Sequence, residues 1–174
     1  MKKIVENRRV RSMLVCAAAG AIIALAPLAA HGQTLNFSGD KCSGSAAPEE
    51  TVTVHAAVTG LSGNYSPVLT IKMAYDVTGE SNLVTPDEQN YTVVLSGYDN
   101  DMATAQDLGG GRWVYGALTA GSGASATDAT LVDMALTLSA SASGSVTLTP
   151  SGYSEINDNP LTAGTACTIT VSEP

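Results

Sequence analysis

Three aspartates in one turn-rich stretch carry side chains well suited to metal chemistry. Asp99, Asp101 and Asp107 offer hard carboxylate oxygens, which are the ligands that calcium prefers. Their spacing lacks the glycine and the terminal glutamate of an EF-hand loop. The pattern leaves two interpretations, a calcium site and a solvated acidic turn, and the acidic turn is favoured. Apart from this calcium, we expect no cofactor.

Two aromatic residues could present a small glycan-binding platform. Trp113 and Tyr115 stand two positions apart, so they point to the same face of a strand. Their flat rings could stack on a sugar, although packing in a buried core is the favoured alternative. Trp113 is the only tryptophan of the chain, whereas a sugar cleft usually needs several aromatic walls.

Catalytic chemistry has little support. A Ser-His-Asp mechanism would have to use His55, which lies in an alternating segment, and the chain has no Gly-x-Ser-x-Gly motif. A glycosidase needs only two carboxylates, so spacing alone does not exclude one. Because no catalytic constellation emerges, we predict that the protein is not an enzyme.

The N-terminal segment has the pattern of a signal peptide. Residues 1–12 carry five basic side chains, and residues 13–30 are apolar throughout. We expect cleavage after Gly32, which would leave Gln33 as the new N-terminus, with cleavage after Ala30 as the second choice. An uncleaved anchor, a twin-arginine signal and lipidation of Cys16 are weaker alternatives. The predicted location is secreted, periplasmic or at the cell surface, with no membrane insertion after cleavage.

Removal of this leader changes the charge. The whole chain has a formal net charge of −8, but five of its eight basic residues and one of its sixteen acidic residues lie in residues 1–32. The remainder holds three basic residues against fifteen acidic ones, a net charge of −12. Such a surface repels phosphate backbones and anionic lipids, which argues against a nucleic-acid partner.

Two cysteines remain after the leader. Cys42 and Cys167 lie near the two ends of the mature chain, and in an exported protein an even pair is most simply a disulfide. The bridge would restrict the unfolded chain by about 4 to 5 kcal/mol in the loop-entropy model. A zinc site is the alternative, but His55 is the only mature histidine and no Cys-x-x-Cys spacing exists.

The body of the chain alternates between apolar and polar residues with a period of two, which predicts strands. Turn-forming segments separate these stretches, and no twelve-residue stretch keeps a 3.6-residue period. The pattern predicts an all-β protein, an antiparallel β-sandwich of about seven to nine strands. We expect residues 1–32 as signal peptide, 33–50 as an N-terminal extension and 51–174 as the sandwich. The expected stripes begin at Val52, Leu69, Tyr91, Trp113, Val132, Val146 and Cys167.

Two stretches resemble the cohesin family, whose sandwich is related to some carbohydrate-binding modules. Residues 68–76, VLTIKMAYD, are similar to the early cohesin strand that ends in Tyr-Asp. Residues 130–138, TLVDMALTL, run on through residues 144–148 and 157–159 as the late cohesin hairpin does. The resemblance spans residues 51–171 and implies a jelly-roll or cohesin-like sandwich in which the first and last strands lie side by side. That arrangement would bring the two cysteines close together.

The chain also departs from the cohesin pattern. Asp76 is followed by Val77 where proline is usual, the cysteine pair is atypical, and no dockerin-like calcium repeat accompanies the domain. The resemblance transfers no binding residue, because cohesins recognise dockerins through a variable sheet face. It implies non-catalytic binding of an extracellular protein or glycan.

A second function class stays open, a structural subunit of a surface filament or extracellular matrix. Residues 34–38, TLNFS, form a short alternating stretch ahead of Cys42. Such a segment could pair with the open sheet edge of a neighbouring copy by strand addition. Self-assembly is therefore an alternative to binding a foreign partner.

Overall fold

The computed structural model describes residues 32–61, 67–99, 101–124 and 129–172 of the 174-residue chain. The predicted signal peptide lies outside this part except for Gly32. No helix within the described residues is long and apolar enough to cross a membrane. The described residues contain two single-turn 3₁₀ helices, η2 (Glu80–Asn82) and η3 (Glu88–Asn90), and all their other regular structure is strand.

Thirteen strands occur in the described part of the chain, and eight of them have five or more residues. They are β1 (Thr34–Ser38), β2 (Gly44–Ala46), β3 (Thr51–Thr59), β4 (Thr70–Thr78), β5 (Tyr91–Val93), β6 (Met102–Asp107), β7 (Arg112–Leu118), β8 (Ala129–Thr137), β9 (Ser145–Pro150), β10 (Glu155–Ile156), β11 (Asn159–Pro160), β12 (Thr162–Ala163) and β13 (Cys167–Val171).

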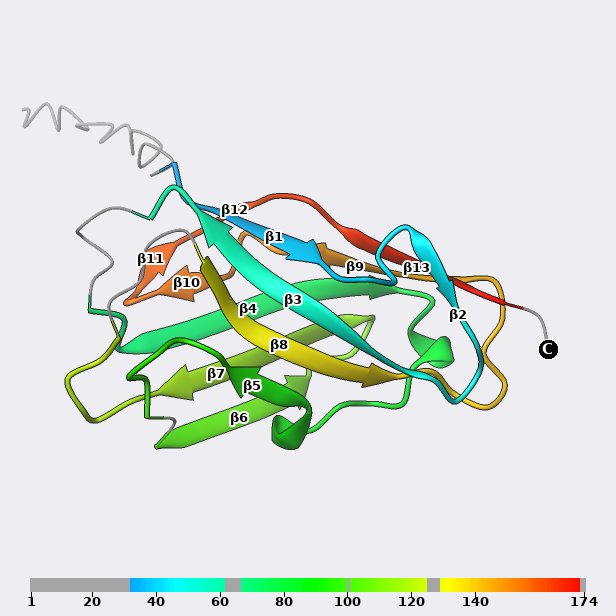
Figure 1. Ribbon diagram of the computed structural model, residues 1–174, viewed down its shortest axis with the longest axis horizontal. Helices are drawn as coiled ribbons and strands as arrows, with labels where there is room; N and C mark the ends of the chain where they lie inside the picture. The colour runs from blue at the N-terminus through cyan, green and yellow to red at the C-terminus, as the bar shows by residue number, and fades with distance from the viewer. Residues whose placement is uncertain (1–31, 62–66, 100, 125–128, 173–174) are drawn as a thin grey trace, which may run out of the picture.

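The strands form two sheets that face each other as layers (Figure 1). The first sheet has the order β12-β1-β3-β8-β5. The second has the order β11-β10-β4-β9-β13-β2, with β7 added beside β4 and β6 beside β7. All pairs are antiparallel except β1 with β12 and β2 with β13. The predicted β-sandwich is confirmed, with two parallel pairs that the sequence pattern did not indicate.

Alternation along the strands places one face of each sheet in the core. In β3, Val52, Val54 and Ala56 are buried while Thr51 and Thr53 are exposed. Because side chains point to opposite faces at successive positions, a strand with apolar residues at every second position buries them against the facing sheet. This confirms the period-two interpretation of these segments.

The predicted extension at residues 33–50 is part of the sandwich. β1 pairs with β3 over its whole length and with β12 at Thr34 and Leu35, and β2 pairs with β13. Leu35 and Phe37 are buried, so the apolar side chains of this alternating segment are part of the core. A domain boundary at residue 51 therefore cuts through both sheets. Residues 34–38 are also not free to pair with another copy.

A disulfide joins Cys42 and Cys167, as predicted. Cys167 is the first residue of β13 and is buried, and Cys42 lies two residues before β2, which runs alongside β13. Since both sulfur atoms are used in the bridge, the zinc alternative does not apply to them. The bond ties the first strands of the domain to its last strand.

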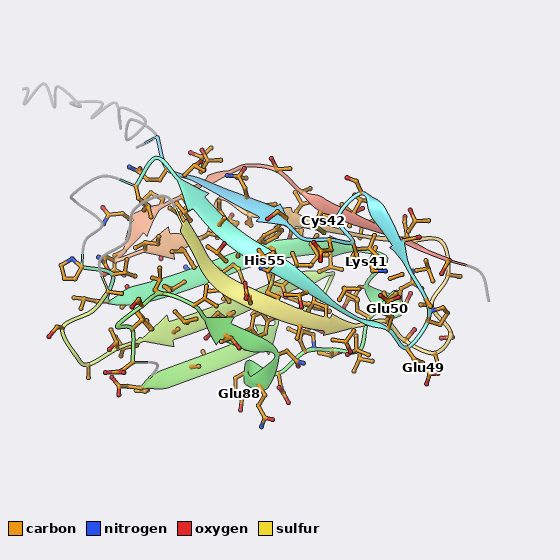
Figure 2. All side chains as sticks on the ribbon, in the orientation of Figure 1. Lys41, Cys42, Glu49, Glu50, His55 and Glu88 are labelled. Atoms are coloured by element: carbon orange, nitrogen blue, oxygen red, sulfur yellow. A yellow bond between two sulfur atoms is a disulfide. The ribbon has the colours of Figure 1, made fainter. Side chains whose placement is uncertain are left out.

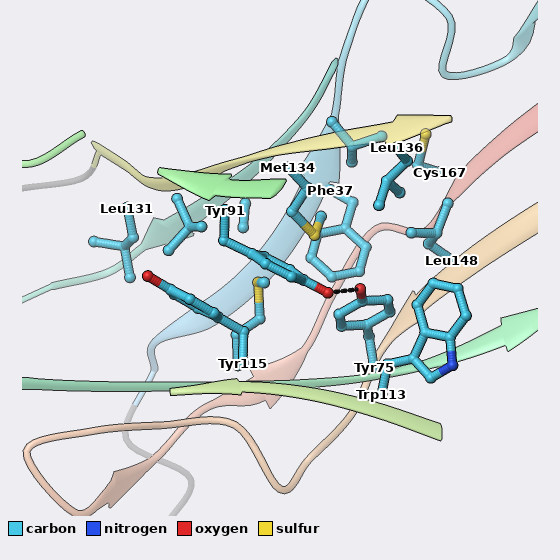
Figure 3. Close-up of a cluster of buried hydrophobic side chains, with 14 of the residues drawn as sticks. Phe37, Tyr75, Tyr91, Trp113, Tyr115, Leu131, Met134, Leu136, Leu148 and Cys167 are labelled. Atoms are coloured by element: carbon cyan, nitrogen blue, oxygen red, sulfur yellow. Dashed lines mark hydrogen bonds between the residues drawn. The ribbon is translucent and has the colours of Figure 1, made fainter. Parts of the chain in front are cut away.

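Aromatic rings fill the space between the sheets (Figure 3). Tyr75 contacts Phe37 and Trp113 edge to face, with ring centroids 5.7 and 5.9 Å apart. Tyr91 stacks on Tyr115 with a centroid distance of 4.5 Å. The hydroxyl groups of Tyr75 and Tyr91 are hydrogen-bonded at 2.5 Å, which connects β4 of one sheet to β5 of the other. Such ring pairs add about 0.5–1.5 kcal/mol each to the area they bury.

We expect the double variant Cys42→Ala/Cys167→Ala to lose about 4 kcal/mol of unfolding free energy, because the bridge closes a loop of 125 residues in the unfolded chain. Urea denaturation measures the change. The matched control is Ser45→Ala, an exposed residue of β2, which should leave the midpoint nearly unchanged. An unchanged midpoint in the double variant would contradict the prediction.

Removing both hydroxyls from the buried tyrosine pair should cost less than the sum of the two single removals. In Tyr75→Phe the hydroxyl of Tyr91 stays buried without this partner, at a cost of about 1–3 kcal/mol. The double variant Tyr75→Phe/Tyr91→Phe removes both polar groups, so it should be more stable than the sum of the single losses predicts. Denaturation of all four proteins tests this, and strict additivity would refute it.

The same burial predicts a sensitivity to alkali. Burial raises the pKa of Tyr75 well above its ordinary value and raises the pKa of Tyr91 to about 12. The folded state therefore holds its protons where unfolded tyrosine, with a pKa near 10, loses them. Stability should be complete below pH 10 and fall as the pH rises from about 10 towards 12. Thermal unfolding across this range measures it, and Tyr75→Phe/Tyr91→Phe should flatten the profile.

Candidate functional site

The outer surface of β4, β7 and β6 exposes large apolar side chains, among them Met102 and Leu118. β7 sends Trp113, Tyr115 and Ala117 into the core, and its alternate residues Val114 and Leu118 face outwards. The pairing of β6 with β7 puts Met102 opposite Leu118, Thr104 opposite Gly116 and Gln106 opposite Val114. We call this surface the β4–β7–β6 face.

A shallow groove of about 380 Å³ crosses this face. Its floor is formed by Val114 and Gly116, and Met102 and Leu118 form one wall with exposed fractions of 67% and 39%. Gly116 has no side chain to fill the groove. The space above it is free, because a Cβ there would meet only Thr104 Cγ2 at 3.6 Å and the Ile71 carbonyl at 4.0 Å. The groove is thus apolar, open and accessible to another molecule.

A second hollow of about 280 Å³ continues the face towards Tyr153 and shares Lys72 and Val114 with the groove. Arg112 donates from Nε to Asp76 Oδ1 at 2.8 Å and from Nη2 to Asp76 Oδ2 at 3.2 Å. Its guanidinium carbon lies 5.3 Å from the centre of the Tyr153 ring. The hydrogen bond to Asp76 raises the pKa of Arg112, so the guanidinium stays charged.

The Arg112–Asp76 pair is too exposed to stabilise the fold much. The two side chains are 41% and 47% exposed, so solvent screens their attraction. The geometry instead orients the guanidinium beneath Tyr153, whose side chain is 63% exposed. Accessible tyrosine and arginine side chains are among those that contribute most to binding in protein interfaces.

The opposite sheet presents a polar surface. His55 Nδ1 lies 2.6 Å from Asp133 Oδ1, and Lys41 Nζ lies 3.0 Å from Glu50 Oε1 (Figure 2). The Ala47 amide, and then Lys41, lower the pKa of Glu50. A small hollow of about 220 Å³ lies beside them, lined also by Asp40, Thr51 and Thr53. Within the described residues, His55 is hydrogen-bonded to a carboxylate but to no serine or cysteine, so these contacts form no catalytic triad.

The predicted glycan platform is wrong. Trp113 is 2% exposed and Tyr115 is 0% exposed, and both rings pack in the core. The alternative of core packing holds, because on β7 the larger aromatic side chains point to the facing sheet. The residues that sequence reasoning missed are on the other face of the same strand and beyond it, namely Val114, Leu118, Met102, Arg112 and Tyr153.

The predicted calcium site is not assembled. Asp101 lies just before β6 and Asp107 ends it, so at about 3.3 Å per residue their backbones are roughly 20 Å apart. The Asp101 carboxylate accepts a hydrogen bond from the Ala120 amide at 2.6 Å, and that of Asp107 accepts one from the Gly109 amide at 2.7 Å. The sequence pattern grouped these aspartates in one turn, but β6 lies between Asp101 and Asp107 and keeps them apart. No group of three potential ligands occurs in the described chain.

A scan against protein-family models finds no match, and a search of curated proteins finds none either. Solved structures do match. A cohesin module from a Clostridium perfringens family 33 glycoside hydrolase has a TM-score of 0.62 at 13% identity, covering 83% of this chain and 99% of that one. The sixth cohesin of scaffoldin B from Acetivibrio cellulolyticus, solved in complex with a dockerin, has a TM-score of 0.58 at 16% identity, covering 81% and 99%.

A third match is the solution structure of CaCohA2 from Clostridium acetobutylicum, with a TM-score of 0.60 at 18% identity, covering 82% of this chain and 92% of that one. At such low identity these likenesses concern the fold. The chain has the cohesin-like β-sandwich that its sequence resemblance implied.

The Asp101 contact predicts a local effect on hydrogen exchange. Removing the carboxylate in Asp101→Ala deletes a charge-assisted bond worth about 1.5 kcal/mol, so the Ala120 amide should exchange about tenfold faster. Asp107→Ala is the matched control and should affect Gly109 instead. Added calcium should not slow exchange at Ala120 in the unaltered protein, and protection by calcium would contradict the placement of these aspartates.

Proposed function

We propose that this protein is a non-catalytic module that binds a partner protein outside the cytoplasm through the β4–β7–β6 face. The observation that carries the proposal is the exposure of large apolar side chains around one groove, with Tyr153 and Arg112 in the adjoining hollow. Exposed apolar patches on monomeric proteins mark interaction sites, and tyrosine, methionine and arginine are enriched in interfaces.

Charge specifies the chemistry of the partner further. The two basic residues of the face are already paired, Lys72 with Glu155 and Arg112 with Asp76. Asp101 and Asp107, at the two ends of β6, form no ion pair in the described residues. The chain beyond residue 32 has a net charge of −12. A partner that presents apolar side chains flanked by basic ones fits this surface.

Two observations favour a protein partner over a glycan. Tyr153 is the single large aromatic side chain exposed on the described surface, and one ring gives a sugar little to stack on. Solved structures of similar fold include cohesins in complex with dockerins, which are protein partners.

The proposed location rests on the leader pattern of residues 1–32 and on the disulfide, which suits an oxidising compartment.

The hypothesis of a filament subunit that donates residues 34–38 to a neighbouring copy is no longer supported. The donor strand that it required, residues 34–38, is β1 and lies between β12 and β3 in the first sheet. Extracting it would expose Leu35 and Phe37, which are buried.

Filling the groove should abolish partner binding without unfolding the protein. Gly116→Lys adds a side chain to the floor where space is available, so its melting temperature should stay close to that of the unaltered protein. Thr53→Lys, on the exposed face of the other sheet, is the matched control with the same change of charge.

The measurement is comparative capture from the proteins that the source secretes. The partner should bind the unaltered protein and Thr53→Lys but not Gly116→Lys. Calorimetry with the purified partner should then show that Tyr153→Ala weakens binding at least tenfold, as expected when an interface loses an anchoring tyrosine. Equal affinity of all four proteins for that partner would refute the proposed face.

A further inference from the structure

β6 is an open sheet edge of unusual length for this protein. It pairs with β7 on one side, and no strand of the described chain pairs with its other side (Figure 1). The other edge strands, β12, β5, β11 and β2, have only two or three residues, whereas β6 has six. Proteins commonly protect long edges with lysine, proline or a bulge. The sequence of β6, MATAQD, contains neither lysine nor proline, and its pairing with β7 is regular.

The hydrogen-bond pattern shows which backbone groups the edge offers. The Leu108 amide donates to the Arg112 carbonyl at 2.9 Å, and in an antiparallel ladder such bonded pairs recur at every second residue. Thr104 and Gln106 therefore bond to β7. Ala103, Ala105 and Asp107 direct their amides and carbonyls away from β7, towards the open side. Three consecutive bonding positions are thus available to an incoming strand.

We propose that two copies of this chain pair through β6, antiparallel and with a two-fold axis at Ala105. In this register Ala105 lies opposite its own copy, and Ala103 lies opposite Asp107 of the second copy. Met102 then lies opposite Leu108 of the second copy, once on each side of the axis. These residues are 67% and 53% exposed, so the pairing removes exposed apolar surface from water at both ends of the strand.

Other symmetric registers fit less well. An axis at Thr104 would place Met102 opposite Gln106 and leave Leu108 beyond the paired strand. An axis at Asp107 would place two carboxylates directly opposite each other, which is destabilising. The axis at Ala105 is the register that pairs the two exposed apolar side chains and separates the acidic ones.

The pairing has a consequence for the surface of the assembly. Residues directly opposite in an antiparallel pair point to the same side of the sheet, so the two second sheets would form one continuous sheet. Both β4–β7–β6 faces would then lie on the same side, related by the two-fold axis. The dimer would present two copies of this face together, but its existence does not depend on what that face binds.

The first experiment blocks the edge without removing a bond to β7. The amide of Ala103 points to the open side, so Ala103→Pro deletes only a donor that the second copy would use. Ala103→Val keeps this donor and is the matched control. In sedimentation equilibrium of the full chain from an exporting host, the unaltered protein and Ala103→Val should form dimers as concentration rises, and Ala103→Pro should stay monomeric. Monomers throughout for the unaltered protein, or a dimeric Ala103→Pro, would overturn the proposal.

The second experiment tests the register and does not need proline to be accommodated. The axis at Ala105 places Thr104 opposite Gln106 of the second copy as a non-bonded pair, where the Cα atoms of such pairs lie about 4.5 Å apart, close enough for a disulfide. Thr104→Cys/Gln106→Cys should therefore form a dimer on a non-reducing gel after mild oxidation, and Thr104→Cys alone should not. A cross-linked Thr104→Cys would overturn the register, and an uncross-linked double variant would overturn the pairing.

Discussion

The hydrogen bond between the hydroxyl groups of Tyr75 and Tyr91 crosses the interior from one sheet to the other. Tyr75 comes from β4, which also pairs with β7, β9 and β10, and Tyr91 comes from β5 at the edge of the facing sheet. Edge-to-face contacts with Phe37 and Trp113 surround Tyr75. Because this cluster uses the inward face of β4 and β7, the outward face of the same strands is left for other molecules.

The chain ends depend on a different constraint. β1 and β2 come from the first described residues, and β12 and β13 come from the last, yet each early strand runs parallel to a late one. Parallel neighbours so far apart in sequence cannot be joined by a tight turn. The disulfide between Cys42 and Cys167 supplies a covalent connection at this place. It therefore stabilises the part of the sandwich that local turns cannot organise.

The exposed surfaces of the second sheet divide into a face and an edge. The face offers apolar side chains and a tyrosine–arginine pair, while the edge offers backbone donors and acceptors along β6. Face recognition depends on which side chains the partner inserts, whereas edge pairing depends mainly on main-chain hydrogen bonds and register. Met102 belongs to both surfaces, since it lines the groove and is the first residue of the edge strand β6.

The sequence by itself predicted most of the strands from their period of two and the disulfide from an even cysteine pair in an exported chain, and the cohesin-like sandwich followed from a family resemblance. It did not predict β6, because residues 102–107, MATAQD, hold one large apolar side chain and lie in a stretch rich in aspartate. At residues 112–118, only the tertiary structure decided which face of the strand is buried. In residues 112–118, Trp113, Tyr115 and Ala117 alternate with Val114, Gly116 and Leu118, so both faces lack charge beyond Arg112. Periodicity cannot choose between two such faces. Tertiary packing decides it: Trp113 packs edge to face against Tyr75 of the neighbouring strand β4, and Tyr115 stacks on Tyr91 of the facing sheet, so the other face of β7 is left to line the groove.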